Sequence, residues 1–164
     1  MRNEKITQIL EPIRPLSNID INDYFKLINL PTYIGTYPKD YLKDIPTSEL
    51  KNDFSTIINL GSSDTGGSHW VMVCKKDDEL LYFDSYGVEF IDDSIKKFID
   101  RCNCENRYLN ESQIQDFNSI LCGYYCMKVI KNIYINGLKI KDSIKMFDEN
   151  PSINNKDLAD DLYI

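Results

Sequence analysis

The chain has 164 residues, of which 42% are hydrophobic and 27% are charged. This length and composition predict a single domain, residues 1–164, with a hydrophobic core of its own. The 26 acidic residues outnumber the 19 basic ones and give a formal net charge of −7. Such a charge argues against general binding to nucleic acid or to anionic membranes, because both require a positive field. No apolar run approaches the roughly 20 residues that a membrane span requires.

The five cysteines are an odd number, and the N-terminal residues lack the hydrophobic stretch of a signal peptide. These features predict free thiols, a reducing compartment and a protein that is not secreted. A zinc site is disfavoured, because no Cys-x-x-Cys pair occurs and His69 is the only histidine. Cys74 and Cys126 lie in apolar segments and are expected to pack in the core.

The N-terminal part of the chain carries weak structural signals. Residues 1–18 contain two prolines and are expected to lie extended on the surface. A short helix is predicted from Asp20, acting as N-cap, to about Leu30. Residues 33–42 have the composition of a loop with an apolar centre, which either packs as a structural loop or lines a cleft. Residue types alone favour the structural loop.

A β-branched run over residues 55–60 predicts a buried strand. The glycine-rich stretch that follows, residues 61–68, lacks the lysine and the helix of a phosphate-binding loop, so its glycines more plausibly allow the backbone to approach a substrate. The remaining elements are predicted as helices over residues 92–102, 140–147 and 156–162 and a strand over residues 107–109.

Residues 69–74 and 80–86 predict a β-hairpin with its turn centred near residues 77 and 78. This register places His69 roughly opposite Tyr86 and within about one residue pair of Asp84. The only histidine and a carboxylate therefore meet at the open end of the hairpin. A shift by one residue would reverse the faces on which these side chains lie.

Residues 115–126 predict a polar loop that leads into an amphipathic helix with Cys122 at its N-terminus. Free backbone N–H groups and the helix dipole at that position favour a thiolate. Gly123 is expected to leave space beside the sulfur for a substrate carbonyl, and the Gln115 amide is a candidate oxyanion donor. Gly137 is expected to adopt the left-handed conformation after the helix.

Each of these residues has a commoner structural role when taken alone. A cysteine in an apolar helix usually packs, a single histidine is usually structural, an aspartate at a strand end often caps a turn, and a glutamine is usually a surface amide. The combination of His69, Asp84, Gln115 and Cys122 is what indicates a cysteine nucleophile with a histidine base.

Three motifs carry a resemblance to a known family. They are residues 67–71 (GSHWV), 82–87 (YFDSYG) and 115–126 (QDFNSILCGYYC). They resemble the adenovirus-type maturation proteases, which share a clan with the proteases of SUMO and other ubiquitin-like proteins. Residues 33–42 also resemble the N-terminal cleft segment of versions from large DNA viruses, virophages and Polinton-type elements. The resemblance covers about residues 33–135.

The resemblance implies an α+β fold with a small mixed sheet flanked by helices. It implies Cys122 as nucleophile, His69 as base and then acid, and Asp84 as the residue that orients the imidazole. The Gln115 side chain and the Cys122 backbone N–H would form the oxyanion hole. The adenovirus enzyme has glutamate where this chain has Asp84, and aspartate is commoner elsewhere in the clan.

The resemblance also implies a substrate class and its binding residues. Trp70, Gly67 and Gly123 would line the site, and cleavage would follow glycine in viral capsid precursors, in the virion and in the host cytoplasm or viral factory. We expect a monomer without a required cofactor or metal. Cys104 lies where the adenovirus enzyme tethers an activating peptide, and the net charge of −7 argues against stimulation by DNA.

Three alternatives remain open at this stage. The same triad serves proteases that remove SUMO or ubiquitin-like proteins, and it also serves acetyltransferases. A binding module that keeps the fold without catalysis is a third reading, against which the four intact residues argue.

Overall fold

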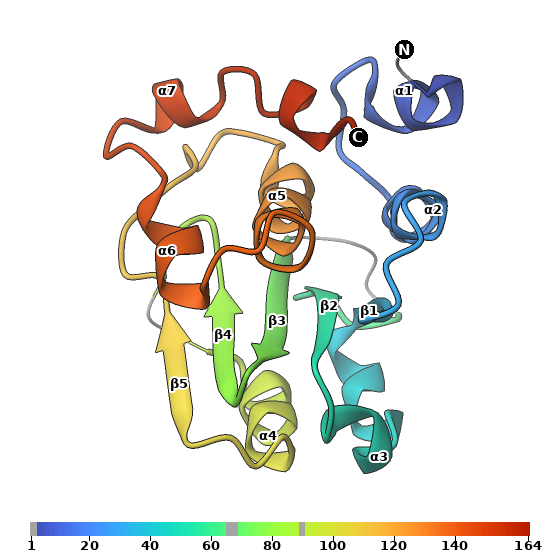
Figure 1. Ribbon diagram of the computed structural model, residues 1–164, viewed down its shortest axis with the longest axis vertical. Coiled ribbons are helices and arrows are strands. Elements are labelled where there is room, and N and C mark those ends of the chain that lie inside the picture. The colour runs from blue at the N-terminus through green and yellow to red at the C-terminus, as the bar shows by residue number, and fades with distance from the viewer. Residues whose placement is uncertain (1–2, 65–68, 89–90) are drawn as a thin grey trace.

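The computed structural model describes residues 3–64, 69–88 and 91–164, and its centre is a five-stranded mixed sheet (Figure 1). The strands follow chain order across the sheet: β1 (Tyr33–Pro38), β2 (Phe54–Asn59), β3 (Trp70–Lys76), β4 (Glu79–Phe83) and β5 (Asn106–Leu109). The outer pairs, β1 with β2 and β4 with β5, are parallel, and the inner pairs are antiparallel. The predicted α+β class with a small mixed sheet is confirmed.

Helices cover both faces of the sheet (Figure 1). The helical elements are α1 (Glu4–Leu10), α2 (Asn18–Leu27), η1 (Lys39–Asp44), α3 (Thr47–Leu50), α4 (Asp93–Arg101), α5 (Cys122–Tyr134), α6 (Ile140–Lys145), α7 (Pro151–Asn154) and η2 (Asp160–Leu162), where η marks a 3₁₀ helix. One core lies between the sheet and α1, α2 and α5. A second core lies between the sheet and η1, α3 and α4. No helix among the described residues is long and apolar enough to cross a membrane.

Strand β3 contributes side chains to both cores. Met72 and Cys74 face the core under α5, whereas Val71 and Val73 face the core over α4. This division follows from the alternation of side chains along a strand. Because both faces are buried, β3 is apolar almost throughout.

The predicted hairpin between β3 and β4 is confirmed, with a tight turn at Asp77 and Asp78. Both residues have positive φ, 52° and 62°, as a two-residue hairpin turn requires. The pairing runs from Lys76 opposite Glu79 to Met72 opposite Phe83. Continued by three pairs, this register places His69 opposite Tyr86.

The N-terminal prediction was wrong. Residues 4–10 form α1, which buries Ile6, Ile9 and Leu10, because their spacing places them on one helical face. Helix α2 is present, but its N-cap is Ser17, and Asp20 completes a capping box from the third helical position.

Two further predictions were wrong. Residues 33–42 form β1 and the start of η1 instead of a loop, because pairing with β2 satisfies their backbone groups. A helix over residues 156–162 is replaced by α7, which Asn150 caps and Pro151 begins, and by η2. Proline suits the first helical turn, where its missing N–H would have no partner. The left-handed conformation expected at Gly137 is confirmed, with φ at 73°.

Candidate active site

His69 and Asp84 meet at the open end of the β3–β4 hairpin. The imidazole Nε2 lies 2.7 Å from Oδ1 of Asp84, and the carboxylate is buried. The backbone N–H of Tyr86 donates to the same oxygen at 2.9 Å. Asn110 holds the Asp84 backbone from the other side, accepting from its N–H at 2.9 Å and donating to its carbonyl. The carboxylate is therefore fixed before it orients the imidazole.

Cys122 is the first residue of α5, which runs along β3 (Figure 1). The Cys126 sulfur contacts the Trp70 carbonyl at the start of that strand, and the Tyr134 hydroxyl donates to the Lys75 carbonyl near its end. Among the described residues no side chain caps this helix, so the N–H groups of its first turn keep their hydrogen-bonding capacity. Cys122 is partly exposed, whereas the other four cysteines are buried, and all five are free thiols. The expected core positions of Cys74 and Cys126 are confirmed.

The Cys122 side chain helps to raise the pKa of His69. Burial lowers the pKa of His69, but the hydrogen bond to Asp84 and the interaction with Cys122 outweigh it and raise this pKa to about 9. Because Asp84 takes Nε2, the nitrogen left for the sulfur is Nδ1. This atom is buried, and no described residue forms a well-aligned hydrogen bond with it. Catalytic hydrogen bonds are often long or poorly aligned before substrate binds.

Tyr86 covers one face of the imidazole. The two rings are stacked, with their centroids 4.2 Å apart and their planes at 12°. The Tyr86 hydroxyl lies 3.4 Å from the carbonyl oxygens of both Phe117 and Ser119, its acceptors. Tyr86 therefore connects the histidine to the loop that precedes Cys122. The sequence placed Tyr86 opposite His69 but assigned it no role.

Gln115 lies in that loop and is fully buried. The Ser85 hydroxyl donates to its Oε1, and its Nε2 donates to the Ser119 carbonyl at 2.9 Å. These bonds fix the direction of the amide and leave its second hydrogen without a partner among the described residues. Sequence reasoning missed Ser85 and Asn110; both follow strand ends and are buried, but a polar residue at a strand end is usually exposed.

A groove of about 770 Å³ opens at Cys122. Trp70, Tyr86, Tyr37 and Ser63 line it together with the cysteine. Gly123 is closely packed, because a Cβ there would meet the Trp70 ring at 3.3 Å and Leu16 at 3.5 Å. The space expected beside the Cys122 sulfur for a substrate carbonyl stays a prediction. Gly67, the other predicted binding glycine, lies outside the described residues.

Comparison with known proteins gives a likeness of fold. No protein-family model matches the chain. No curated protein sequence matches it either. The solved structure of the ASFV pS273R protease matches with a TM-score of 0.64 over 88% of this chain, at 15% identity. The chain has the fold of a viral protease. It spans 66% of the length of that protease chain.

The SUMO protease Ulp1 also matches, over 97% of this chain and 84% of its own, at 17% identity. The TM-score of that match is 0.49. The likeness to the ASFV protease, at 15% identity, is a likeness of fold.

Cys104, the candidate tether for an activating peptide, lies at the opposite end of the hairpin from His69. It is buried, and its thiol donates to the carbonyl of Asp78 at 2.8 Å, at the turn end of the hairpin whose open end carries His69. A disulfide with a peptide would have to displace that contact. Within the described residues, no group of three or more metal-ligating side chains is assembled.

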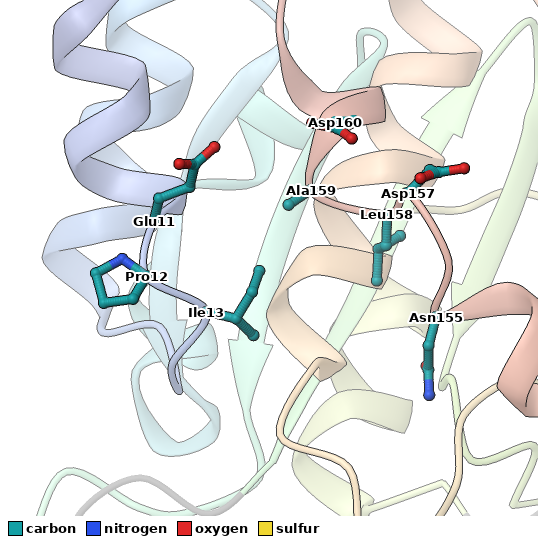
Figure 2. Close-up of a pocket in the computed structure, with 8 residues that line it drawn as sticks. All are labelled: Glu11, Pro12, Ile13, Asn155, Asp157, Leu158, Ala159 and Asp160. Atoms are coloured by element: carbon teal, nitrogen blue, oxygen red, sulfur yellow. The ribbon is translucent and has the colours of Figure 1, made fainter.

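A second depression, of about 440 Å³, lies between the α1–α2 connection and the C-terminal segment (Figure 2). Glu11, Pro12 and Ile13 line one side, and residues 155 and 157–160 line the other. Its lining contains none of the four predicted catalytic residues, so we assign the site to the groove at Cys122.

Proposed function

We propose that this protein is a cysteine endopeptidase with Cys122 as nucleophile. The observation that carries the proposal is the environment of the His69 ring. One ring nitrogen is hydrogen-bonded to buried Asp84, and the Cys122 side chain helps to raise the pKa of the ring. An activated cysteine requires such a base and a third group that orients it. Cys122 opens on a groove, as a nucleophile must.

The chemistry follows in two stages. The Cys122 thiolate attacks the scissile carbonyl and forms a C–S bond, and the imidazolium of His69 gives its proton to the leaving amine as the C–N bond breaks. The neutral imidazole then takes a proton from water, which attacks the thioester and releases the acid. Throughout, Asp84 holds Nε2–H, so that Nδ1 is the nitrogen that transfers protons.

Stabilisation of the oxyanion is assigned to Gln115 and to the backbone N–H of Cys122. The Gln115 amide is held by Ser85 and Ser119, and a donor fixed in advance costs no reorganisation in the transition state. The N–H of Cys122 belongs to the uncapped first turn of α5. Trp70 serves as a wall of the groove.

For the substrate, we propose viral structural precursors cleaved after glycine during virion maturation, in the virion and in the host cytoplasm or viral factory. Two observations support this choice: the motif resemblance to adenovirus-type proteases, and the fold shared with the ASFV pS273R protease. The second candidate is removal of SUMO or a ubiquitin-like protein. It is favoured by the use of the same His, Asp, Gln and Cys motifs in those enzymes.

The first test is the pH dependence of alkylation by iodoacetamide, located by peptide mass spectrometry in wild type and His69→Ala. We expect Cys122 to react at pH 6 faster than the other four cysteines, and His69→Ala to remove the advantage. Equal reactivity of all five cysteines would contradict the proposal that this protein is a cysteine protease. A ubiquitin-like protein with a C-terminal electrophile then separates the substrates, because a maturation protease should ignore it and cleave capsid precursors.

A further inference from the structure

The segment between α1 and α2 forms one wall of the groove at Cys122. Pro15, Leu16, Ser17 and Asn18, here called the 15–18 segment, line the groove together with the cysteine. The motif resemblance begins near residue 33 and assigns this segment no role. It nevertheless faces the same cavity as the proposed nucleophile.

Contacts with β3 and α5 fix the position of this wall. The Trp70 indole N–H donates to the Leu16 carbonyl at 2.9 Å. The Leu16 side chain packs where a Cβ of Gly123 would lie, at 3.5 Å, and the Tyr124 hydroxyl donates to the Leu10 carbonyl at 3.1 Å. Trp70 follows His69, and Gly123 follows Cys122, so the wall is attached directly beside both proposed catalytic residues.

Contacts among residues 9–20 also fix the position of the 15–18 segment. Arg14 donates to the Ile9 carbonyl at 2.6 Å and pairs with Asp20 at 2.9 Å. Ser17 and Asp20 form the capping box of α2. The backbone beneath Ser17 and Asn18 is therefore fixed, although both side chains are exposed. A fixed backbone with exposed side chains is suited to binding a ligand at little entropic cost.

The chemistry of the groove indicates what it binds. The described residues that line it are all uncharged, although the chain carries 26 acidic and 19 basic residues. Its volume, about 770 Å³, falls in the range of clefts that bind ligands. Uncharged walls leave a buried charge on the substrate without a partner, which is costly.

We infer that the 15–18 segment binds the substrate residues that precede the scissile bond and selects uncharged side chains there. The inference rests on the proposed function and adds the substrate class to it. The acyl portion is assigned to this wall because it remains attached to Cys122 after the amine leaves, and the groove extends from that residue.

The test reverses the selection by charge. Asn18→Asp and Asn18→Lys are compared by the rate at which peptidyl vinyl sulfones modify Cys122, with Asp, Ala or Lys placed in turn at each peptide position. Asn52→Asp and Asn52→Lys are the controls, because Asn52 is exposed and precedes β2, whose opposite end carries groove residue Asn59. Thermal melting confirms that all variants fold.

At one peptide position, Asn18→Asp should favour Lys over Asp and Asn18→Lys should favour Asp over Lys, by roughly twofold to fivefold each. High salt should reduce both preferences, and the Asn52 variants should leave the wild-type preference for Ala unchanged. Unchanged preferences in both Asn18 variants would overturn the inference while leaving the protease standing. The protease itself fails if no reagent modifies Cys122 faster than the other cysteines and His69→Ala has no effect.

Discussion

Helix α5 carries two cysteines one turn apart, and their surroundings are opposite. Cys126 is fully buried, its sulfur lies 3.6 Å from the Trp70 carbonyl, and burial raises the pKa of its thiol well above the ordinary value. Cys122 is partly exposed, borders the groove and lies at the helix N-terminus, which no described side chain caps. Its side chain helps to raise the pKa of His69. The same side chain on the same helix is thus inert in one position and suited to reaction in the other. Access and a base, rather than residue type, make the difference.

The largest test of this contrast removes each sulfur. Cys122→Ala should abolish peptide cleavage, a loss of roughly 10⁵-fold or more in kcat, since it removes the nucleophile. Cys126→Ala should retain most activity and instead lower the melting temperature, because it leaves a small cavity in the core. Circular dichroism should show both variants folded. An active Cys122→Ala protein would refute the assignment.

The second test weakens the base that distinguishes Cys122. Asp84→Asn should lower kcat by roughly 10³- to 10⁴-fold, because it disturbs the tautomer and orientation of His69 but removes no reacting atom. Asp100→Asn is the matched control, since Asp100 is an exposed acid on α4 paired with Arg107. If kcat falls no further in Asp84→Asn than in Asp100→Asn, Asp84 does not orient the histidine.

The third test concerns the oxyanion donor. Gln115→Ala should lower kcat by roughly 10²- to 10³-fold with a smaller effect on KM. Gln113→Ala removes the neighbouring exposed amide, which donates only to the Gln115 carbonyl, and should change kcat little. Cys122 alkylation by iodoacetamide should survive in Gln115→Ala, because that reaction forms no oxyanion. Loss of alkylation would point to a structural defect instead.

The smallest effect is on stability. The pKa of His69 is raised on folding to about 9, so the protonated ring stabilises the folded state. This contribution is complete below the unfolded pKa of about 6.5 and is lost as pH rises through about 9.

Urea unfolding of wild type and His69→Ala at pH 6 and pH 10 measures this contribution. The difference in unfolding free energy between the two proteins should shrink by roughly 3 kcal/mol at the higher pH, because each unit of pKa difference corresponds to about 1.4 kcal/mol. Ionisation of groups that do not contact His69 cancels in the comparison. A difference that does not change with pH would show that His69 has no raised pKa.

Local patterns predicted the parts of the site that depend on local geometry. Two apolar runs with a turn centred on Asp77 and Asp78 predicted the hairpin register that brings His69 to Asp84. The helical spacing after Cys122 placed it at the start of α5. The same reasoning failed for residues 4–10, because two nearby prolines suggested an extended chain while the apolar spacing formed α1.

The sequence by itself determined the hairpin and the position of a cysteine at a helix N-terminus, because turn chemistry and periodicity act over a few residues. Only the tertiary structure decided that Trp70 bonds to Leu16, 54 residues away, that Asn110 fixes Asp84, and that Trp70 and Leu16 fill the space beside Gly123. These contacts join segments distant in sequence, and no local preference specifies which distant partner fills a given space. The walls of the groove therefore depend on packing, whereas the pairing of His69 with Asp84 and the position of Cys122 at the start of α5 could be predicted.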